Sequence, residues 1–200
     1  MIEVEIKVPL NNENKQRLLQ GAEFLVSKTL KDTYYDSADY TLSLRDRWLR
    51  ERNGRFELKQ PPVEGSHVGN TAVQRYVEFE SEADIKKELN LEGESLKMAL
   101  DKAEIRPFVT IVSKREKYKK GEFTIDLDET DFGFAVAEVE LMVDAAVRVE
   151  AAQEKINDFL QAVGIGVVPR QLGKVAEYLR RHDKAHFNAL VNAKVITAKY

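Results

Sequence analysis

Strict alternation of charged and apolar residues near the N-terminus constrains the fold more than any other feature of the chain. Residues 2–8, IEVEIKV, place isoleucine and valine at even positions and Glu3, Glu5 and Lys7 at odd positions. A period of two is typical of a β-strand with one buried face, because successive side chains point to opposite sides. The segment is therefore predicted to be a strand whose charged face carries two carboxylates and one ammonium.

The same alternation recurs along the chain, with turn signals between the segments. Asn53-Gly54 is a strong two-residue hairpin signal between WLRER and RFELKQ. Further strands are predicted at residues 32–36, 74–80, 109–118, 123–128 and 134–141. Helices are predicted at residues 11–21, 81–90, 94–103 and 149–164, with a helical tail formed by residues 174–183 and 185–195. Strands joined by tight turns, with helices inserted between them, indicate an antiparallel α+β architecture.

Length and composition limit the class of protein. The 200 residues are expected to form one domain, residues 1–200, with a long hairpin loop at 61–70 and a helical C-terminal segment from about residue 146. The absence of cysteine excludes disulfides and thiolate catalysis. A net charge of −3 gives no general attraction to nucleic acid or to a membrane surface. We expect a cytoplasmic monomer with neither of these partners.

Like charges are paired two residues apart on the charged strand faces. The pairs are Glu3/Glu5, Arg50/Arg52, Asp126/Asp128 and Glu138/Glu140. For any single strand, a solvent-exposed face of an open sheet is the ordinary explanation. Taken together the pairs favour another one, because carboxylates about 6–7 Å apart on one face repel each other unless a cation lies between them. Arginine pairs at the same spacing offer forked donors to phosphate oxygens.

A sheet closed into a barrel would bring the acidic and basic faces together inside. The apolar residues would then point outward and be covered by the helices. A charged interior is costly unless a highly charged ligand occupies it, and a polyphosphate with Mg²⁺ meets that requirement. The charged face of residues 3–7 is therefore predicted to point inward.

These residues resemble the CYTH superfamily, also called the triphosphate tunnel metalloenzymes. EVEIK matches the ExExK signature of the superfamily, and WLRER, ELK, Glu78, SKR, DLD and EVE follow in the expected order over most of the chain. DTYYD, WLRER, DLDETDFGFAVAEVE and GKVAEYL are most similar to animal members that hydrolyse thiamine triphosphate. The chain departs from the vertebrate members at Val175, where a bulkier apolar residue is common.

The resemblance implies a closed eight-stranded antiparallel β-barrel with a charged interior. It implies six metal ligands: Glu3, Glu5, Asp126, Asp128, Glu138 and Glu140. It also implies six phosphate-binding residues, with Glu78 beside them in the tunnel: Lys7, Arg50, Arg52, Lys59, Arg115 and Lys174. The cofactor would be Mg²⁺ or Mn²⁺, and Glu3, Glu5, Lys7 and Tyr34 are assigned to the catalytic group.

Aromatic and C-terminal residues leave alternatives open. Trp48 shares the face of Arg50 and Arg52, so it either stacks on a flat cationic ring of the substrate or packs at the tunnel rim. Tyr34 either faces the tunnel or packs in the core. Lys174 is expected at the tunnel mouth, whereas Arg170, Arg180 and Arg181 are expected in solvent.

The activity implied by the resemblance is metal-dependent hydrolysis of thiamine triphosphate to thiamine diphosphate and phosphate. The substrate would be the small-molecule partner of the chain. Three alternatives remain: an inorganic tripolyphosphatase, a class IV-type adenylyl cyclase of the same superfamily, and a non-catalytic polyphosphate-binding module. The complete set of carboxylates argues against the last, because simple anion binding needs no metal ligands.

Overall fold

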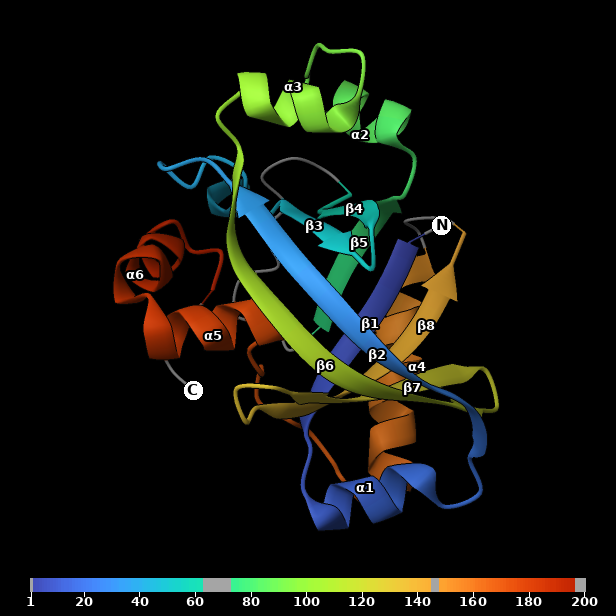
Figure 1. The fold of residues 1–200 in the computed structure, drawn as a ribbon. Helices are drawn as coiled ribbons and strands as arrows, with labels where there is room; N and C mark the ends of the chain where they lie inside the picture. The colour runs from blue at the N-terminus through green and yellow to red at the C-terminus, as the bar shows by residue number, and fades with distance from the viewer. Residues whose placement is uncertain (1, 63–72, 145–147, 197–200) are drawn as a thin grey trace.

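Eight antiparallel strands close into a barrel in the computed structural model, which describes residues 2–62, 73–144 and 148–196 (Figure 1). Around the barrel the strand order is β1-β5-β4-β3-β2-β6-β7-β8, and β8 pairs back with β1. The strands are β1 (Ile2–Pro9), β2 (Glu23–Asp36), β3 (Trp48–Arg52), β4 (Arg55–Gln60), β5 (Val73–Phe79), β6 (Arg106–Lys120), β7 (Phe123–Thr130) and β8 (Ala135–Val143). The predicted closed antiparallel barrel is confirmed.

Helices lie on the outside of the barrel in three groups. Figure 1 shows α2 and α3 at one end and α5 and α6 at the side of the barrel, while α4 runs behind the barrel to α1 at the other end. Their bounds are α1 (Asn12–Leu19), α2 (Glu82–Glu88), α3 (Leu96–Lys102), α4 (Val149–Ala162), α5 (Lys174–His182) and α6 (Lys184–Asn192), with a short 3₁₀ helix η1 (Ser43–Arg45). Residues 145–147, at the predicted start of the helical C-terminal segment, lie outside the described residues, as does most of the predicted loop at 61–70.

The apolar faces of the strands form the core beneath these helices. Val4, Ile6 and Val8 of β1 are fully buried against α4, whose Ile156 and Leu160 are also fully buried. Burying each such side chain contributes roughly 1.5–3 kcal/mol to folding relative to exposure. The hydrophobic core therefore lies between the barrel wall and the helices, which directs the opposite, charged face of β1 into the barrel.

Two further clusters attach the other helix pairs. Leu49 of β3 and Leu58 of β4 pack against Ile85 of α2 and Leu96 of α3. On another side, α5 and α6 pack against one end of β2 and β6: Tyr34, Val109, Ile111, Leu179 and Leu190 belong to this cluster. The α5–α6 cluster also contacts Trp48, so it reaches the barrel mouth.

Turn chemistry in the sequence predicted local structure well. Asn53 and Gly54 both have positive φ, 49° and 87°, as the inverse type I turn of a tight hairpin requires. The Ser81 side chain accepts a hydrogen bond from the backbone N–H of Asp84 and caps α2.

The longest strands exceed their predicted lengths. Only residues 32–36 of β2 were expected, but the strand begins at Glu23 and pairs with β6 over its whole length. A register shift between Phe24 and Val26 breaks the alternation in this part of β2, which explains why the pattern there gave no strand signal.

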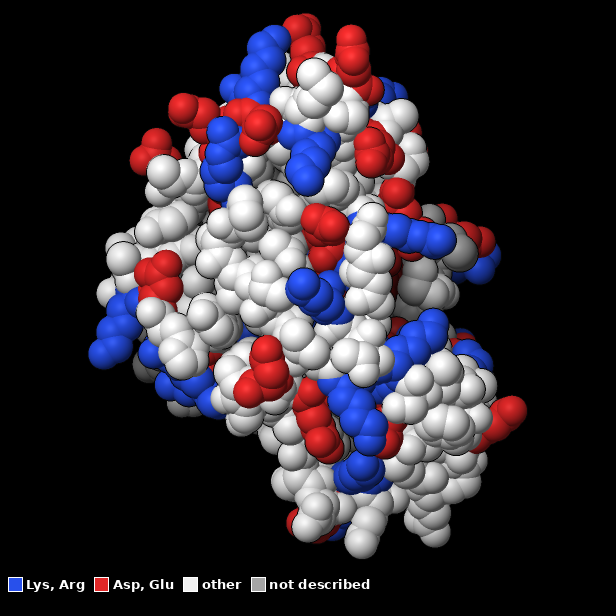
Figure 2. All heavy atoms as spheres, in the orientation of Figure 1, with Lys and Arg blue, Asp and Glu red and all other residues white. Residues whose placement is uncertain are grey.

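The molecular surface is of mixed charge. Lys, Arg, Asp and Glu side chains are interspersed on the face drawn in Figure 2. No helix in the described ranges is long and apolar enough to cross a membrane.

Candidate active site

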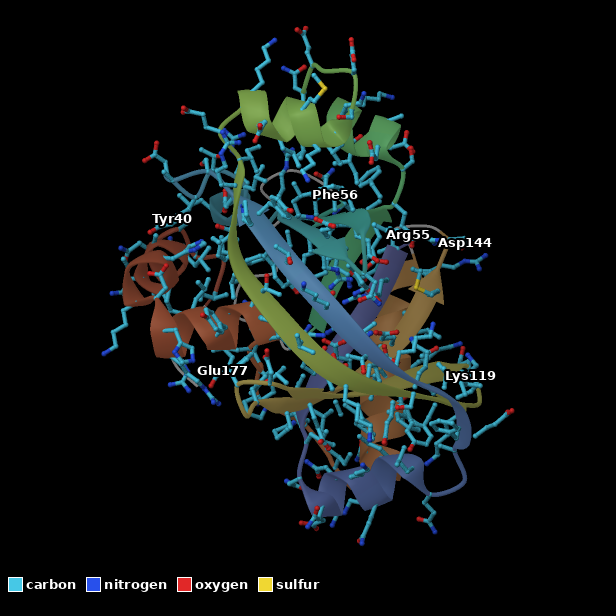
Figure 3. The ribbon with its side chains drawn as sticks, viewed as in Figure 1. Tyr40, Arg55, Phe56, Lys119, Asp144 and Glu177 are labelled. Carbon is cyan, nitrogen blue, oxygen red and sulfur yellow. The ribbon has the colours of Figure 1, made fainter. Side chains whose placement is uncertain are left out.

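A cavity of about 340 Å³ lies inside the barrel. Its lining includes thirteen of the predicted site residues: Glu3, Glu5, Lys7, Tyr34, Trp48, Arg50, Arg52, Lys59, Glu78, Arg115, Glu138, Glu140 and Lys174. The other two, Asp126 and Asp128, are fully buried in the wall and contact Arg115 of the lining. The charged strand faces therefore point into the barrel and not to solvent, and Figure 3 shows side chains from many strands converging there.

The register of the strands places opposite charges side by side. Lys7 of β1 lies across from Glu138 of β8, and Arg115 of β6 lies across from Asp128 of β7. On the other side of the barrel, Asp32 of β2 is paired with Arg52 of β3. Because side chains alternate between faces, these cross-strand pairs all meet on the inner face.

Carboxylates form two groups with spacing suited to a cation. Glu3, Glu5 and Glu140 each offer one oxygen within 4.8 Å of the others, and so do Asp126, Glu138 and Glu140. Burial, together with the charges of Asp126 and Glu3, raises the pKa of Glu140 well above its usual range. Hard divalent cations prefer oxygen ligands, so these oxygens fit a cation such as Mg²⁺.

Asp126 and Asp128 differ although they share a strand face. Burial raises the pKa of Asp126 despite Arg115 and Lys117, and its Oδ1 makes no well-oriented hydrogen bond within the described residues, although Lys117 Nζ lies 2.9 Å away. Burial alone would raise the pKa of Asp128, but hydrogen bonds from Arg115 lower it. Asp128 belongs to neither carboxylate group, and its assignment as a metal ligand stays a prediction.

Arg115 is the central cation of the acidic side. Its guanidinium contacts Asp126, Asp128 and Glu138, with nitrogen–oxygen distances of 2.6 Å to Asp128 Oδ2 and 2.7 Å to Glu138 Oε2. Burial alone would raise the pKa of Glu138. The positive charges of Lys7 and Arg115 outweigh this effect and lower the pKa well below its usual range. Glu138 is therefore ionised.

Lys7 lies between the two carboxylate groups. Its ammonium contacts Glu5 and lies 3.6 Å from Glu138 Oε1. Burial alone would lower the pKa of Lys7, but the charges of Glu5 and Glu138 outweigh it and raise the pKa. The side chain is therefore a fixed positive charge inside the barrel.

The other predicted phosphate-binding residues are each held by a carboxylate. Arg50 Nε donates to Glu57 at 2.8 Å, and Arg52 donates to both oxygens of Asp32 at 2.6 and 2.9 Å. Lys59 contacts Glu3 and lies 2.9 Å from Glu78. Lys174 Nζ donates to Asp128 at 2.7 Å. These contacts pre-orient cations that could exchange a carboxylate for a phosphate oxygen.

Aromatic residues line part of the cavity. Trp48 and Tyr34 both do so, and Tyr34 is 5% exposed. Trp48 lies across the strand pair from Lys59, so an aromatic surface adjoins a phosphate-binding candidate. Leu172, Val175 and Ile196 add apolar lining.

A profile of the CYTH domain matches residues 1–168. The chain belongs to the CYTH family. Thiamine-triphosphatases of Homo sapiens and Macaca fascicularis are 30% and 29% identical to it, each over 96% of this chain and 90% of the relative.

Solved structures of CYTH-like architecture agree with the barrel. A protein of Pyrococcus horikoshii is 25% identical, with a TM-score of 0.62 over 90% of this chain and 99% of its own. A putative adenylyl cyclase from Hippeastrum, described as having a dominant triphosphatase activity, is 20% identical with a TM-score of 0.57, over 90% of this chain and 95% of its own. At this identity the second likeness bears on the fold alone.

Several residues of this CYTH barrel were missed from the sequence. Asp32 is fully buried and holds Arg52, and Lys117 pairs with Asp126. The Lys117 side chain could have been found, because it shares the parity of Arg115. Asp46 and Tyr76 also line the cavity, and the turn position of Asp46 gave no signal.

One C-terminal expectation was wrong. Arg170 was expected in solvent, but it lines the cavity and donates to the backbone oxygen of Val195. Arg180 and Arg181 are exposed, as expected, and pair with Glu177, which is labelled on α5 in Figure 3.

Crowded carboxylates and cations predict that an anionic ligand stabilises the protein. We expect a saturating mixture of tripolyphosphate and Mg²⁺ to raise the melting temperature by several degrees, because a ligand at 100 times its Kd adds about 2.7 kcal/mol to the free energy of unfolding. Differential scanning fluorimetry measures this. Sulfate at equal ionic strength is the control, and a melting temperature unmoved by tripolyphosphate would contradict the charged-cavity assignment.

Proposed function

We propose that this CYTH protein is a metal-dependent hydrolase that converts thiamine triphosphate to thiamine diphosphate and phosphate. The observation that carries the proposal is one cavity with three kinds of lining: carboxylate groups spaced for a cation, a set of oriented lysines and arginines, and the single tryptophan of the chain. The similarity to two mammalian thiamine-triphosphatases supports the same substrate.

The basic residues bind and orient the triphosphate. Arg50, Arg52 and Arg115 present forked donors, and Lys59 and Lys174 add point charges on opposite sides of the cavity. In the reaction a water oxygen attacks the terminal phosphorus, the bond to the bridging oxygen breaks, and its electron pair stays on the departing diphosphate. Fixed cations around the phosphates stabilise this charge at no reorganisation cost.

The carboxylates would hold the metal. Glu3, Glu5 and Glu140 form one group, and Asp126, Glu138 and Glu140 form the other. When bound, Mg²⁺ or Mn²⁺ neutralises phosphate charge and polarises a phosphoryl oxygen. Lys7, which contacts Glu5 and lies near Glu138, places a positive charge beside these carboxylates, where it could bind the terminal phosphate. Tyr34 lines the same cavity and remains a candidate for this catalytic group.

A panel of substrates tests the proposal. Phosphate, pyrophosphate and cyclic AMP release are measured from thiamine triphosphate, tripolyphosphate and ATP with Mg²⁺ or Mn²⁺. We expect phosphate release with the highest kcat/KM on thiamine triphosphate. Preference for tripolyphosphate would make the chain an inorganic tripolyphosphatase, cyclic AMP with pyrophosphate would make it a cyclase, and binding without turnover would make it a non-catalytic module.

Trp48 is predicted to distinguish thiamine triphosphate from tripolyphosphate. An indole face attracts a flat cationic thiazolium by about 0.5–2 kcal/mol, or roughly two- to thirtyfold in affinity. Trp48→Ala should therefore raise KM for thiamine triphosphate by about that factor, while the KM for tripolyphosphate changes little. Steady-state kinetics on both substrates measure this. Equal losses would mean that Trp48 only packs at the rim.

A further inference from the structure

Asp46 is a buried carboxylate in the cavity wall that neither carboxylate group includes. It follows η1 in the turn that leads into β3, with a left-handed backbone, φ 59° and ψ 30°. Its side chain is buried, 4% exposed, and lines the cavity. It is therefore a negative charge at the aromatic part of the site, separate from the carboxylates at Glu3, Glu5 and Glu138.

Two aromatic donors converge on one oxygen of this carboxylate. Trp48 Nε1 donates to Asp46 Oδ1 at 2.8 Å, and the Tyr76 hydroxyl donates to the same oxygen at 3.2 Å. Both rings line the cavity. One turn residue thus connects aromatic side chains of β3 and β5, and it fixes the direction of the indole ring through the ring's own N–H.

We propose that Asp46 is a positioning residue for substrate specificity, which orients Trp48 and biases the cavity toward a flat cationic ring over a neutral base. The inference rests on the proposed hydrolysis of thiamine triphosphate and adds to it a residue that selects the organic end. Its action is on Trp48 and on the local charge, not on the phosphates.

Charge explains the bias toward a cation. A hydrogen bond to an ionised acceptor is roughly twice as strong as a neutral one, and the negative acceptor raises the electron density of the indole that a cation meets. Arg170 lines the same cavity. Burial and the charges of Asp46 and Glu5 raise the pKa of Tyr76, whereas the charge of Arg170 lowers it. Loss of the Asp46 charge would leave the positive charge of Arg170 less compensated beside a cationic ring.

Asp46 is also linked to the phosphate side of the cavity. Lys59 Nζ lies 5.8 Å from the centre of the Tyr76 ring, and Lys59 is the cross-strand partner of Trp48. A ligand with a phosphate on Lys59 therefore places the group attached to that phosphate chain near Trp48 and Asp46. The chemistry selected is a short polyphosphate ester of a flat organic cation.

Asp46→Asn is the clean test of this role. Asparagine also adopts the left-handed backbone, keeps a carbonyl oxygen that can accept from Trp48, and removes the charge, with an amide NH2 in place of the second carboxylate oxygen. Glu104→Gln is the matched control, because Glu104 is exposed, has a φ of 56°, and loses the same charge outside the cavity lining.

Two measurements are made on the parent and both variants. Steady-state kinetics use thiamine triphosphate and tripolyphosphate with Mg²⁺, and quenching of Trp48 fluorescence gives the Kd for thiamine diphosphate. We expect Asp46→Asn to raise KM for thiamine triphosphate and the Kd for thiamine diphosphate by about three- to tenfold. The kcat for thiamine triphosphate and both constants for tripolyphosphate should stay within about twofold, as should every value for Glu104→Gln.

The outcomes separate this inference from the proposed function. Equal changes on both triphosphates, or no change in the Kd for thiamine diphosphate, would overturn the role of Asp46. A parent that does not hydrolyse thiamine triphosphate would overturn the proposed function, and the fluorescence titration would then still decide on Asp46.

Discussion

Glu140→Gln is expected to abolish nearly all hydrolysis while the protein keeps its fold and melts at or above the temperature of the parent. Glu140 belongs to both carboxylate groups, so the change removes one ligand charge from each. Loss of a residue that hydrogen-bonds a metal ligand typically lowers metal affinity or activity by about 10–100-fold. Loss of a direct ligand should therefore lower kcat/KM by at least about a hundredfold. The melting temperature should not fall, because repulsion from Asp126 and Glu3 is relieved.

Glu5→Gln should lose activity in the same way, because Glu5 belongs to one of the two groups. Glu129→Gln is the control, since Glu129 is exposed on β7, next to the strand that carries Glu140. Kinetics with limiting Mg²⁺ and thermal melts measure both effects. A Glu140→Gln variant as active as the parent would show that this carboxylate holds no essential metal.

Arg115→Ala is expected to lower the free energy of unfolding by about 3–5 kcal/mol, because removing one partner of a buried ion pair leaves uncompensated charge. Three carboxylates lose their shared cation: Asp126, Asp128 and Glu138. Urea denaturation at neutral pH measures the loss. Mg²⁺ should restore part of it by replacing the missing positive charge.

Arg55→Ala is the matched control for this prediction. Arg55 is exposed in the β3–β4 hairpin, and its loss should change the free energy of unfolding by less than about 0.5 kcal/mol. A loss below about 1 kcal/mol for Arg115→Ala would mean that water already screens the acidic side of the cavity.

The charged interior is better explained by ligand binding than by stability. Buried ion pairs cost desolvation that their attraction barely repays, and apolar replacements are often as stable or more so. Here the inner face of almost every strand carries such pairs, while the apolar core lies outside under the helices. A triphosphate with a divalent cation would find its partners already fixed in place.

Alternation made much of the barrel predictable. Period two placed Glu3, Glu5 and Lys7 on one face of β1 and Glu138 and Glu140 on one face of β8. The repeated like-charge pairs then favoured an inward direction for these faces, and all five residues line the cavity. The turn at Asn53-Gly54 was read correctly because few residues adopt positive φ without strain.

Features that depend on barrel closure were not predictable from local pattern. The pairing of β1 with β5 brings Tyr76 opposite Glu3, although these residues are far apart in sequence. Asp46 lies in a turn, where the alternation of a strand cannot predict which way a side chain points. The first half of β2 was missed because a register shift breaks its alternation.

The most direct test of the proposed function is the dependence of thiamine triphosphate hydrolysis on a divalent cation. Phosphate release by the unmodified protein is measured across a Mg²⁺ titration and with excess chelator. A metal-dependent hydrolase should show no release with chelator, recovery as Mg²⁺ is restored, and one phosphate per thiamine diphosphate formed. Release that is unchanged with chelator, or absent at saturating Mg²⁺ and Mn²⁺, would contradict it.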